Sequence, residues 1–352
     1  MSDRLNNPHL ASLQVFRGLA ALGVVFYHAG LFSRRMFDAD FCGDIFKFGE
    51  LGVDFFFVLS GFIIAMIHWK EAGQADRAPR YLKRRFFRIY PLLFVVTTLK
   101  LALTLVSSSG AGADLNASRV VSSYLMIPPP DGAFPIVTAA WTLSHEALFY
   151  GFFLLVLLLS PWVGRLILAS WAVLILGVHG AGMELEGIVG FVFDNHNIEF
   201  LIGVGLSVWL TSKPPSLRAL VGIGAGTVAA IVFGGSLFEP ETGHDQVLAV
   251  RLLVGLGCAG IIAIAASAEK QGYLHYLPKW LCWLGDASYS IYLGHSMVLI
   301  VVMGLLPRWI EPTLGGGHVI AFGAIGVALV ATAMLWRVVE KPILNWSKEW
   351  SR

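Results

Sequence analysis

Residues 11–32 read ASLQVFRGLAALGVVFYHAGLF, and this stretch decides the fold class. It is predominantly apolar, and about 20 such residues are enough for a helix to cross a bilayer. Two ionisable residues, Arg17 and His28, lie inside it. No small-residue cleavage site follows it, so we interpret it as a retained first membrane span and not as a signal peptide.

The rest of the chain has the same character. Hydrophobic residues make up 56% of the 352 positions and charged residues 14%, whereas a soluble domain carries roughly 25% charged residues. The mean hydropathy is +0.71. We therefore predict an all-α integral membrane protein with about ten transmembrane helices, forming a single domain over residues 1–352 with no separate soluble domain. The apolar runs are 11–32, 50–69, 87–106, 136–160, 162–180, 198–212, 218–236, 247–267, 281–306 and 318–339.

The orientation follows from the loops, because Lys and Arg are enriched on the cytoplasmic side. The linker between the second and third runs carries seven basic residues: Lys70, Arg77, Arg80, Lys83, Arg84, Arg85 and Arg88. With this linker inside, 17 basic residues are cytoplasmic and 5 are external, namely Arg34, Arg35, Lys47, Arg119 and Arg308. This predicts cytoplasmic termini and a multi-pass protein of the inner or cytoplasmic cell membrane, with membrane lipid as its surroundings. The net charge of +2 indicates no nucleic-acid partner.

Ionisable residues inside a bilayer are costly and usually face a cavity or a partner. Arg17 and His28 are eleven residues apart, close to three helical turns, so they share a face about 16 Å apart along the axis. An arginine reaching the interface and a histidine packed in the bundle would be the simpler interpretation.

Asp54 in the second run lies at about the same depth as His28. Antiparallel neighbours could bring the two together, and a carboxylate can orient a histidine. A helix-capping role for Asp54 is the alternative.

The fourth run contains WTLSHEALFY, residues 141–150, in which Thr142, Glu146 and Tyr150 share a helix face. A glutamate in mid-membrane favours a functional role. The ninth run places Ser288, Tyr292 and His295 in a polar stripe, which could also serve only to hold helices together.

Arginines in RYLKRRFFRIYP, residues 80–91, form a second polar feature, with Arg84 and Arg88 on one face if the segment is helical. Such a cluster is either an orientation signal or a phosphate-binding site, since guanidinium groups match phosphate oxygens.

Six pieces of the chain together carry a family resemblance. They are LQVFRGLAALGVVFYHAG (13–30), LGVDFFFVLSGFII (51–64), RYLKRRFFRIYPL (80–92), WTLSHEALFY (141–150), SYSIYLGH (288–295) and VVEKP (338–342). The chain resembles the acyltransferase-3 family of membrane acyltransferases, which modify sugars of cell-envelope glycans. Members often have Ser where Thr142 stands, a change that we expect to be tolerated.

The resemblance implies an O-acyltransferase with cytoplasmic acyl-CoA as donor and a sugar hydroxyl of a surface polysaccharide or lipid-linked glycan as acceptor. We expect no metal cofactor. The resemblance also implies that Arg17 and His28 are the functional pair. On this hypothesis His28 is the general base, Asp54 orients it, and Glu146 either assists or binds a sugar hydroxyl. Acetyl is the default acyl group. Arg17, Arg84, Arg85 and Arg88 would bind the CoA phosphates, and the expected acceptor contacts are Tyr150, Ser288, Tyr292 and His295.

Two other classes of protein fit part of the pattern. A transporter of a sugar or a proton-coupled solute would also place Asp, Glu and His inside its spans. The two halves of the chain show no visible repeat, which counts against it. A non-catalytic scaffold would leave the polar groups in the spans unexplained.

Overall fold

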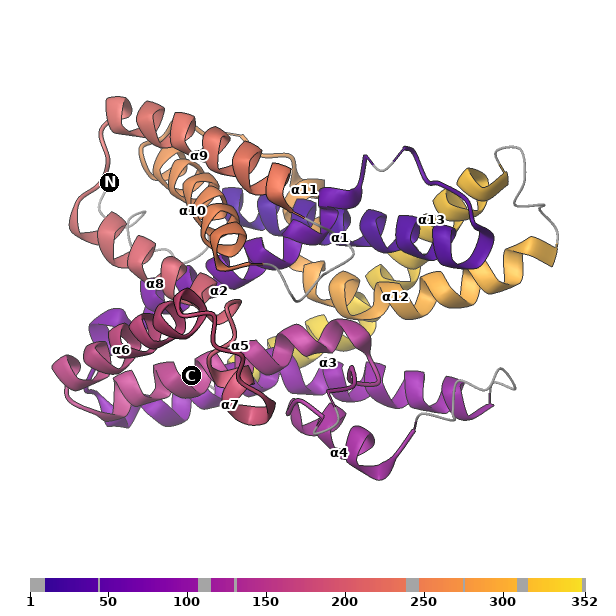
Figure 1. Ribbon diagram of the computed structural model, residues 1–352, viewed down its shortest axis with the longest axis horizontal. Coiled ribbons are helices and arrows are strands. Elements are labelled where there is room, and N and C mark those ends of the chain that lie inside the picture. The colour runs from indigo at the N-terminus through magenta and orange to yellow at the C-terminus, as the bar shows by residue number, and fades with distance from the viewer. Residues whose placement is uncertain are drawn as a thin grey trace. The chain divides into compact units, whose positions relative to one another are not determined.

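The computed structural model describes residues 10–43, 45–106, 115–129, 132–238, 247–274, 276–308 and 316–349. Within these ranges every regular element is a helix (Figure 1). The all-α prediction is therefore confirmed. The termini, whose cytoplasmic position is a prediction, lie outside the described residues.

The helices follow one another with short connections. Their bounds are α1 Ala11–Phe37, α2 Gly52–His68, α3 Ala78–Val106, α4 Ala117–Leu125, α5 Trp141–Leu158, α6 Pro161–Gly180, α7 Gly187–Val192, α8 Asn197–Ser212, α9 Leu217–Leu237, α10 Leu248–Lys270, α11 Lys279–Asp286, α12 Ser288–Leu305, α13 Gly316–Leu335 and α14 Lys341–Glu349. Short 3₁₀ segments are η2 Lys47–Leu51, η3 Trp69–Glu71, η4 Ala75–Arg77, η5 Thr138–Ala140 and η6 Leu306–Arg308, and η7 Trp336–Glu340 is a π-helical turn that joins α13 to α14.

Among the described residues, nine helical stretches are long and apolar enough to cross a membrane. The chain is a multi-pass membrane protein. The predicted run 198–212 forms α8, which has 16 residues. At 1.5 Å per residue it is about 24 Å long, shorter than the roughly 30 Å hydrocarbon core. The structure thus supports nine of the ten predicted spans by length and composition.

One predicted span is not a single continuous helix. The run 281–306 is divided at Ala287 into α11 and α12. The division follows Gly285, which packs so closely on α1 that a Cβ there would overlap the Gln14 carbonyl oxygen. Glycine and aspartate, at 285 and 286, are also weak helix formers. Apolar composition alone does not predict such a break in a helix.

The chain forms two compact units. Unit 1 comprises the described residues of Met1–Ala20, Glu50–Ala78 and Leu148–Asp286, and unit 2 those of Ala21–Gly49, Pro79–Ala147 and Ala287–Arg352. Each unit therefore gathers segments from distant parts of the sequence, and α1 and α5 contribute residues to both. The single-domain organisation stays a prediction.

Unit 1 is built around α2, α8, α9 and α10. Helix α2 packs along α8, and α10 packs along α9 and against α2 and α8 (Figure 1). A Cβ on Gly61 would overlap the Phe200 carbonyl oxygen, and one on Gly203 would overlap that of Val58. Small residues at these two crossings let α2 and α8 approach backbone to backbone, as is common between membrane helices.

Unit 2 contains the second part of α1, nearly all of α3, the start of α5, and α12 and α13. Helices α12 and α13 pack on each other, and α12 also contacts η5 and η7. Helix α3 begins at Ala78, so the basic segment predicted to precede the third span is part of one helix with it. This places Arg84 and Arg88 one turn apart on that helix, as the sequence predicts.

Candidate active site

Arg17 and His28 both lie on α1, which is continuous between them. The predicted helical spacing is therefore confirmed, and it separates the two residues by about 16 Å along the axis. Arg17 belongs to the residues of unit 1 and its Nη1 donates to the Gln14 side-chain oxygen at 3.1 Å. His28 belongs to unit 2.

His28 lies against a second histidine in unit 2. Its Nδ1 lies 3.0 Å from the Val24 carbonyl oxygen and 3.3 Å from Nε2 of His295. The two ring centroids are 4.9 Å apart, with the rings inclined at 64°. His295 is fully buried, and its own Nδ1 lies 3.0 Å from the Ile291 carbonyl oxygen.

These contacts determine where the protons lie in the neutral rings. A carbonyl oxygen only accepts, so Nδ1 of each histidine carries the proton and donates. Nε2 of His295 then holds a lone pair and accepts from His28. It follows by inference from the hydrogen bonds that Nε2 of His28 is unprotonated and can receive a proton. The structure thus gives the Nδ1 proton of His28 two acceptors, the Val24 carbonyl oxygen and Nε2 of His295.

Asp54 has a different partner. In unit 1 Arg251 on α10 donates from Nη1 to Oδ1 of Asp54 at 2.6 Å, and both side chains are buried. Helix α2 begins at Gly52, so Asp54 lies within the first turn and not at the cap. That Asp54 orients His28 was a prediction from matching depth, but the contact seen in the structure is an ion pair with Arg251.

A third ionisable residue accompanies this pair. Glu199 on α8 is fully buried, and a Cβ at Gly255 would lie 3.5 Å from its Cγ. Gly255 is one turn beyond Arg251 on α10, so Glu199 faces the same stretch of that helix. Glu199 lies close enough to Asp54 and Arg251 to interact with both, so the three side chains form one buried ionisable cluster in unit 1.

The polar stripe on α12 is largely engaged with protein groups in unit 2. The Tyr292 and Thr142 hydroxyl oxygens are 2.9 Å apart, and they lie 3.1 and 3.0 Å from the Ala139 carbonyl oxygen. The triangle ties α12 to η5 and the start of α5. Ser288 is fully buried, and its hydroxyl lacks a hydrogen-bond partner among the described residues. Acceptor binding by Ser288, Tyr292 and His295 stays a prediction.

Arg88 is held by the closing motif of the chain. Its Nη1 lies 2.7 Å from Oε1 of Glu340, and Ser290 donates to Oε2 of the same carboxylate at 2.6 Å. Glu340 is 3% exposed. The guanidinium also lies 5.3 Å from the centre of the Tyr289 ring. Glu340 therefore links α3, α12 and η7, so the VVEKP segment has a structural role in unit 2.

The other predicted site residues are arranged along α3 and α5. Arg84 is exposed, and Arg85 is half-buried with its guanidinium 5.7 Å from the centre of the Tyr81 ring. Glu146 and Tyr150 lie one turn apart on α5, Glu146 half-buried in unit 2 and Tyr150 buried in unit 1. Their predicted roles stay predictions.

Sequence reasoning missed Glu199 and the use of Arg251. Both lie inside apolar runs, at 198–212 and 247–267. An ionisable residue in such a run is itself a signal that a partner exists. The signal names no partner, however, because residues on different helices have no fixed spacing.

Comparison with known proteins identifies the family of this chain. Residues 10–337 match the family model of the acyltransferase domain called acyltransferase-3. The chain belongs to the acyltransferase-3 family. The resemblance seen in the six sequence pieces is thereby confirmed, and the family supports an O-acyltransferase. No solved structure matches the chain.

Several curated proteins resemble this family member. The exopolysaccharide production protein ExoZ of Rhizobium meliloti is 30% identical, over 87% of this chain and 93% of ExoZ. The acyltransferase MdmB of Streptomyces mycarofaciens is 27% identical, over 96% of this chain and 92% of MdmB. The peptidoglycan O-acetyltransferase OatA of Listeria monocytogenes is 25% identical, over 97% of this chain but only 57% of OatA.

Proposed function

We propose that the protein transfers an acyl group, by default acetyl, from cytoplasmic acyl-CoA to a sugar hydroxyl, with His28 as the general base. The observation that carries this proposal is the hydrogen-bonding of His28, which directs its proton to Nδ1 and leaves a lone pair on Nε2. A neutral imidazole in this state accepts a proton from an attacking hydroxyl.

The reaction balances with these groups alone. The acceptor oxygen attacks the thioester carbonyl as its proton passes to Nε2 of His28. The carbon–sulfur bond then breaks, and the proton on Nε2 passes to the departing CoA thiolate. His295 accepts a hydrogen bond from Nδ1 throughout, so it holds the ring in place and stabilises the positive charge that forms on it. Products are the acylated sugar and free CoA.

The basic residues on the predicted cytoplasmic side support acyl-CoA as donor. Arg17, Arg84 and Arg85 would bind the CoA phosphates, and the pantetheine arm would extend along α1 to His28. The separation of about 16 Å between Arg17 and His28 is of the order of that arm's length. Arg88 has a smaller part in this proposal, because its guanidinium is already paired with Glu340.

The printed names of relatives support a glycan acceptor. One relative is named for exopolysaccharide production and another for peptidoglycan O-acetylation. A hydroxyl of a surface polysaccharide, or of its lipid-linked precursor, is the acceptor class that we propose for this chain.

A substitution of His28 tests the proposal. His28→Gln keeps hydrogen bonding and much of the volume but does not accept a proton at neutral pH. Because a general base contributes about 10²–10⁴-fold to the rate, acyl transfer from acyl-CoA should fall by that factor in both His28→Gln and His28→Ala. Donor binding should be retained. A His28→Gln protein that folds, binds acyl-CoA and transfers the acyl group near the native rate would overturn the mechanism.

A further inference from the structure

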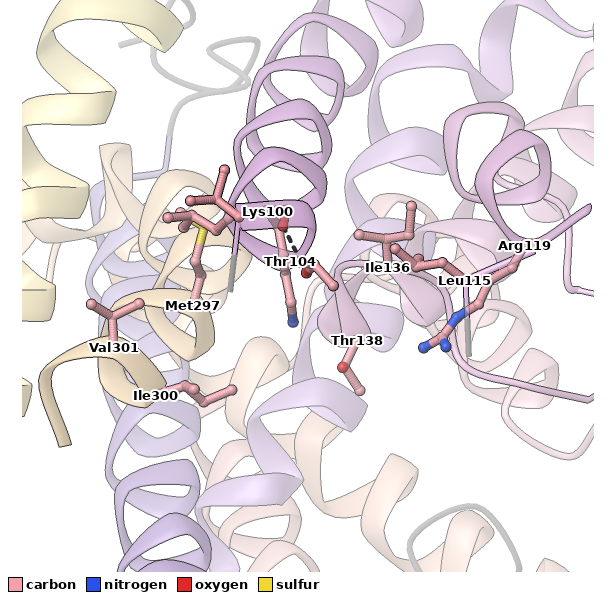
Figure 2. A pocket seen from close by; sticks show the side chains of 11 residues that line it. Lys100, Thr104, Leu115, Arg119, Ile136, Thr138, Met297, Ile300 and Val301 are labelled. Carbon is pink, nitrogen blue, oxygen red and sulfur yellow. Dashed lines mark hydrogen bonds between the residues drawn. The ribbon is translucent and has the colours of Figure 1, made fainter. Parts of the chain in front are cut away.

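A cavity of about 540 Å³ lies in unit 2, between the later part of α3, α4, the segment before η5, and α12 (Figure 2). The volume is in the range of ligand-binding pockets. Most of its wall is apolar and consists of Leu103, Val106, Leu115, Ile136, Met297, Ile300 and Val301. The four polar residues that complete it are Lys100, Thr104, Arg119 and Thr138.

Two cations point into this apolar space. Figure 2 shows the Lys100 ammonium and the Arg119 guanidinium both directed toward the space beside Thr138. The Arg119 Nε donates to the Phe134 carbonyl oxygen at 2.8 Å, which holds the guanidinium in place. Over the described ranges of the chain, Lys100 forms no ion pair.

Two positive groups on one apolar cavity repel each other, and an anion between them relieves that repulsion. The electrostatic gain is large where water is scarce. A phosphate suits this position best because it offers oxygens to a guanidinium and to an ammonium at once. The apolar wall in turn suits a hydrocarbon chain that is attached to the phosphate.

Lys100 and α12 connect the cavity to the histidine pair. The Lys100 ammonium is close enough to His28 and His295 to interact electrostatically with both rings. Met297, on the wall, is two residues beyond His295 on α12. The cavity and the histidine pair therefore share α12 within unit 2.

The same cavity is distant from the arginines assigned to the donor. Lys100 lies twelve residues beyond Arg88 on α3, which is about 18 Å along the helix. The basic segment around Arg84 is predicted to be cytoplasmic and Arg119 to be external. An anion in the cavity therefore belongs to the acceptor side of the reaction.

We propose that this cavity binds the phosphate of a lipid-linked acceptor, with Lys100 and Arg119 on the phosphate and the hydrocarbon chain along the apolar wall. The inference rests on the proposed function and specifies its acceptor: a sugar carried on a chain-bearing phosphate or pyrophosphate. Bilayer phospholipids share this chemistry, so the test separates the two sources.

The test measures binding of farnesyl pyrophosphate, a soluble chain-bearing pyrophosphate, to the purified full-length protein in detergent. Lys100→Gln and Arg119→Gln should each weaken binding roughly 10- to 100-fold, the loss expected for one charge-assisted contact. Farnesol, which lacks the phosphates, should bind the wild type and both variants equally. Lys47→Gln removes a cation from the same predicted side that does not line the cavity, and it should bind farnesyl pyrophosphate like the wild type.

Several results would overturn the inference. One is unchanged affinity for farnesyl pyrophosphate in both Lys100→Gln and Arg119→Gln, provided that each unfolds at the wild-type temperature. Another is displacement of farnesyl pyrophosphate by phosphatidylglycerol at equal concentration, which would assign the cavity to bilayer lipid. Acyl-CoA turnover by the wild type is measured separately. Turnover without the expected effects on farnesyl pyrophosphate binding would contradict the cavity assignment alone, whereas absence of turnover would contradict the acyltransferase proposal.

Discussion

The Arg88 guanidinium on α3 lies 2.7 Å from the carboxylate of Glu340, although 252 residues separate the two in the chain. Glu340 is buried, and Ser290 donates to its second oxygen. The pair joins the start of the third span to the end of the last one within unit 2. An arginine that resembles a phosphate ligand in the sequence thus has a structural partner.

Removing Arg88 should therefore cost stability. Arg88→Ala leaves the buried Glu340 carboxylate without its cation, and we expect a loss of about 3 kcal/mol, at the low end for a broken buried pair because Arg88 is partly exposed. Thermal unfolding in detergent measures the effect. Glu340→Gln in the Arg88→Ala protein should recover part of the loss. An unfolding temperature unchanged by Arg88→Ala would contradict a structural role.

Arg84 provides the matched comparison, because it lies one turn earlier on α3 and is exposed. Arg84→Ala should fold like the wild type but bind acyl-CoA roughly tenfold more weakly, since one phosphate contact is lost. Equilibrium binding of acyl-CoA measures this. Arg77→Ala, at an exposed arginine before α3, serves as the control and should bind normally. Equal affinity for acyl-CoA in Arg84→Ala and the wild type would contradict phosphate binding by Arg84 and favour an orientation signal as the role of the basic segment.

His295 should act by positioning His28 and not by touching the donor. His295→Leu removes one of the two acceptors of the Nδ1 proton of His28 and leaves the Val24 carbonyl oxygen. The imidazole loses its side-chain support, so kcat should fall by about 10-fold or more while the KM for acyl-CoA stays unchanged. His295→Gln can place its amide oxygen where Nε2 lies and should recover part of kcat. Steady-state kinetics with varied acyl-CoA provide both values. A rise in KM without a change in kcat would instead make His295 a binding residue.

The ion pair between Asp54 and Arg251 should be a stability element of unit 1. Arg251→Met leaves Asp54 buried and uncompensated, with an expected cost of about 3–5 kcal/mol. Asp54→Asn combined with Arg251→Met should cost clearly less than Arg251→Met alone, because the double variant no longer carries the Asp54 charge that Arg251 compensates. The four proteins of this double-mutant cycle are compared by thermal unfolding. Strict additivity of the two single effects would show that the pair is not coupled.

The all-α membrane fold and nine of its ten apolar spans could be predicted from the sequence alone, judged on the described residues. The apolar runs have lengths set by the bilayer, and a regular helix fixes the spacing of Arg17 and His28 and of Arg84 and Arg88, since both are local properties. Family membership could also be anticipated, because the six pieces keep their order along the chain.

Which polar groups contact one another depends on the tertiary structure and could not be predicted from the sequence. Asp54 and His28 lie at similar predicted depths, yet Asp54 pairs with Arg251 and His28 with His295. Depth in the membrane does not specify a neighbour, because the choice depends on which helix faces pack and how closely. The break at Ala287 and the partner of Arg88 follow from the same cause. Both depend on contacts between segments hundreds of residues apart. The local sequence does not specify these contacts, although the weak helix formers Gly285 and Asp286 favour the break.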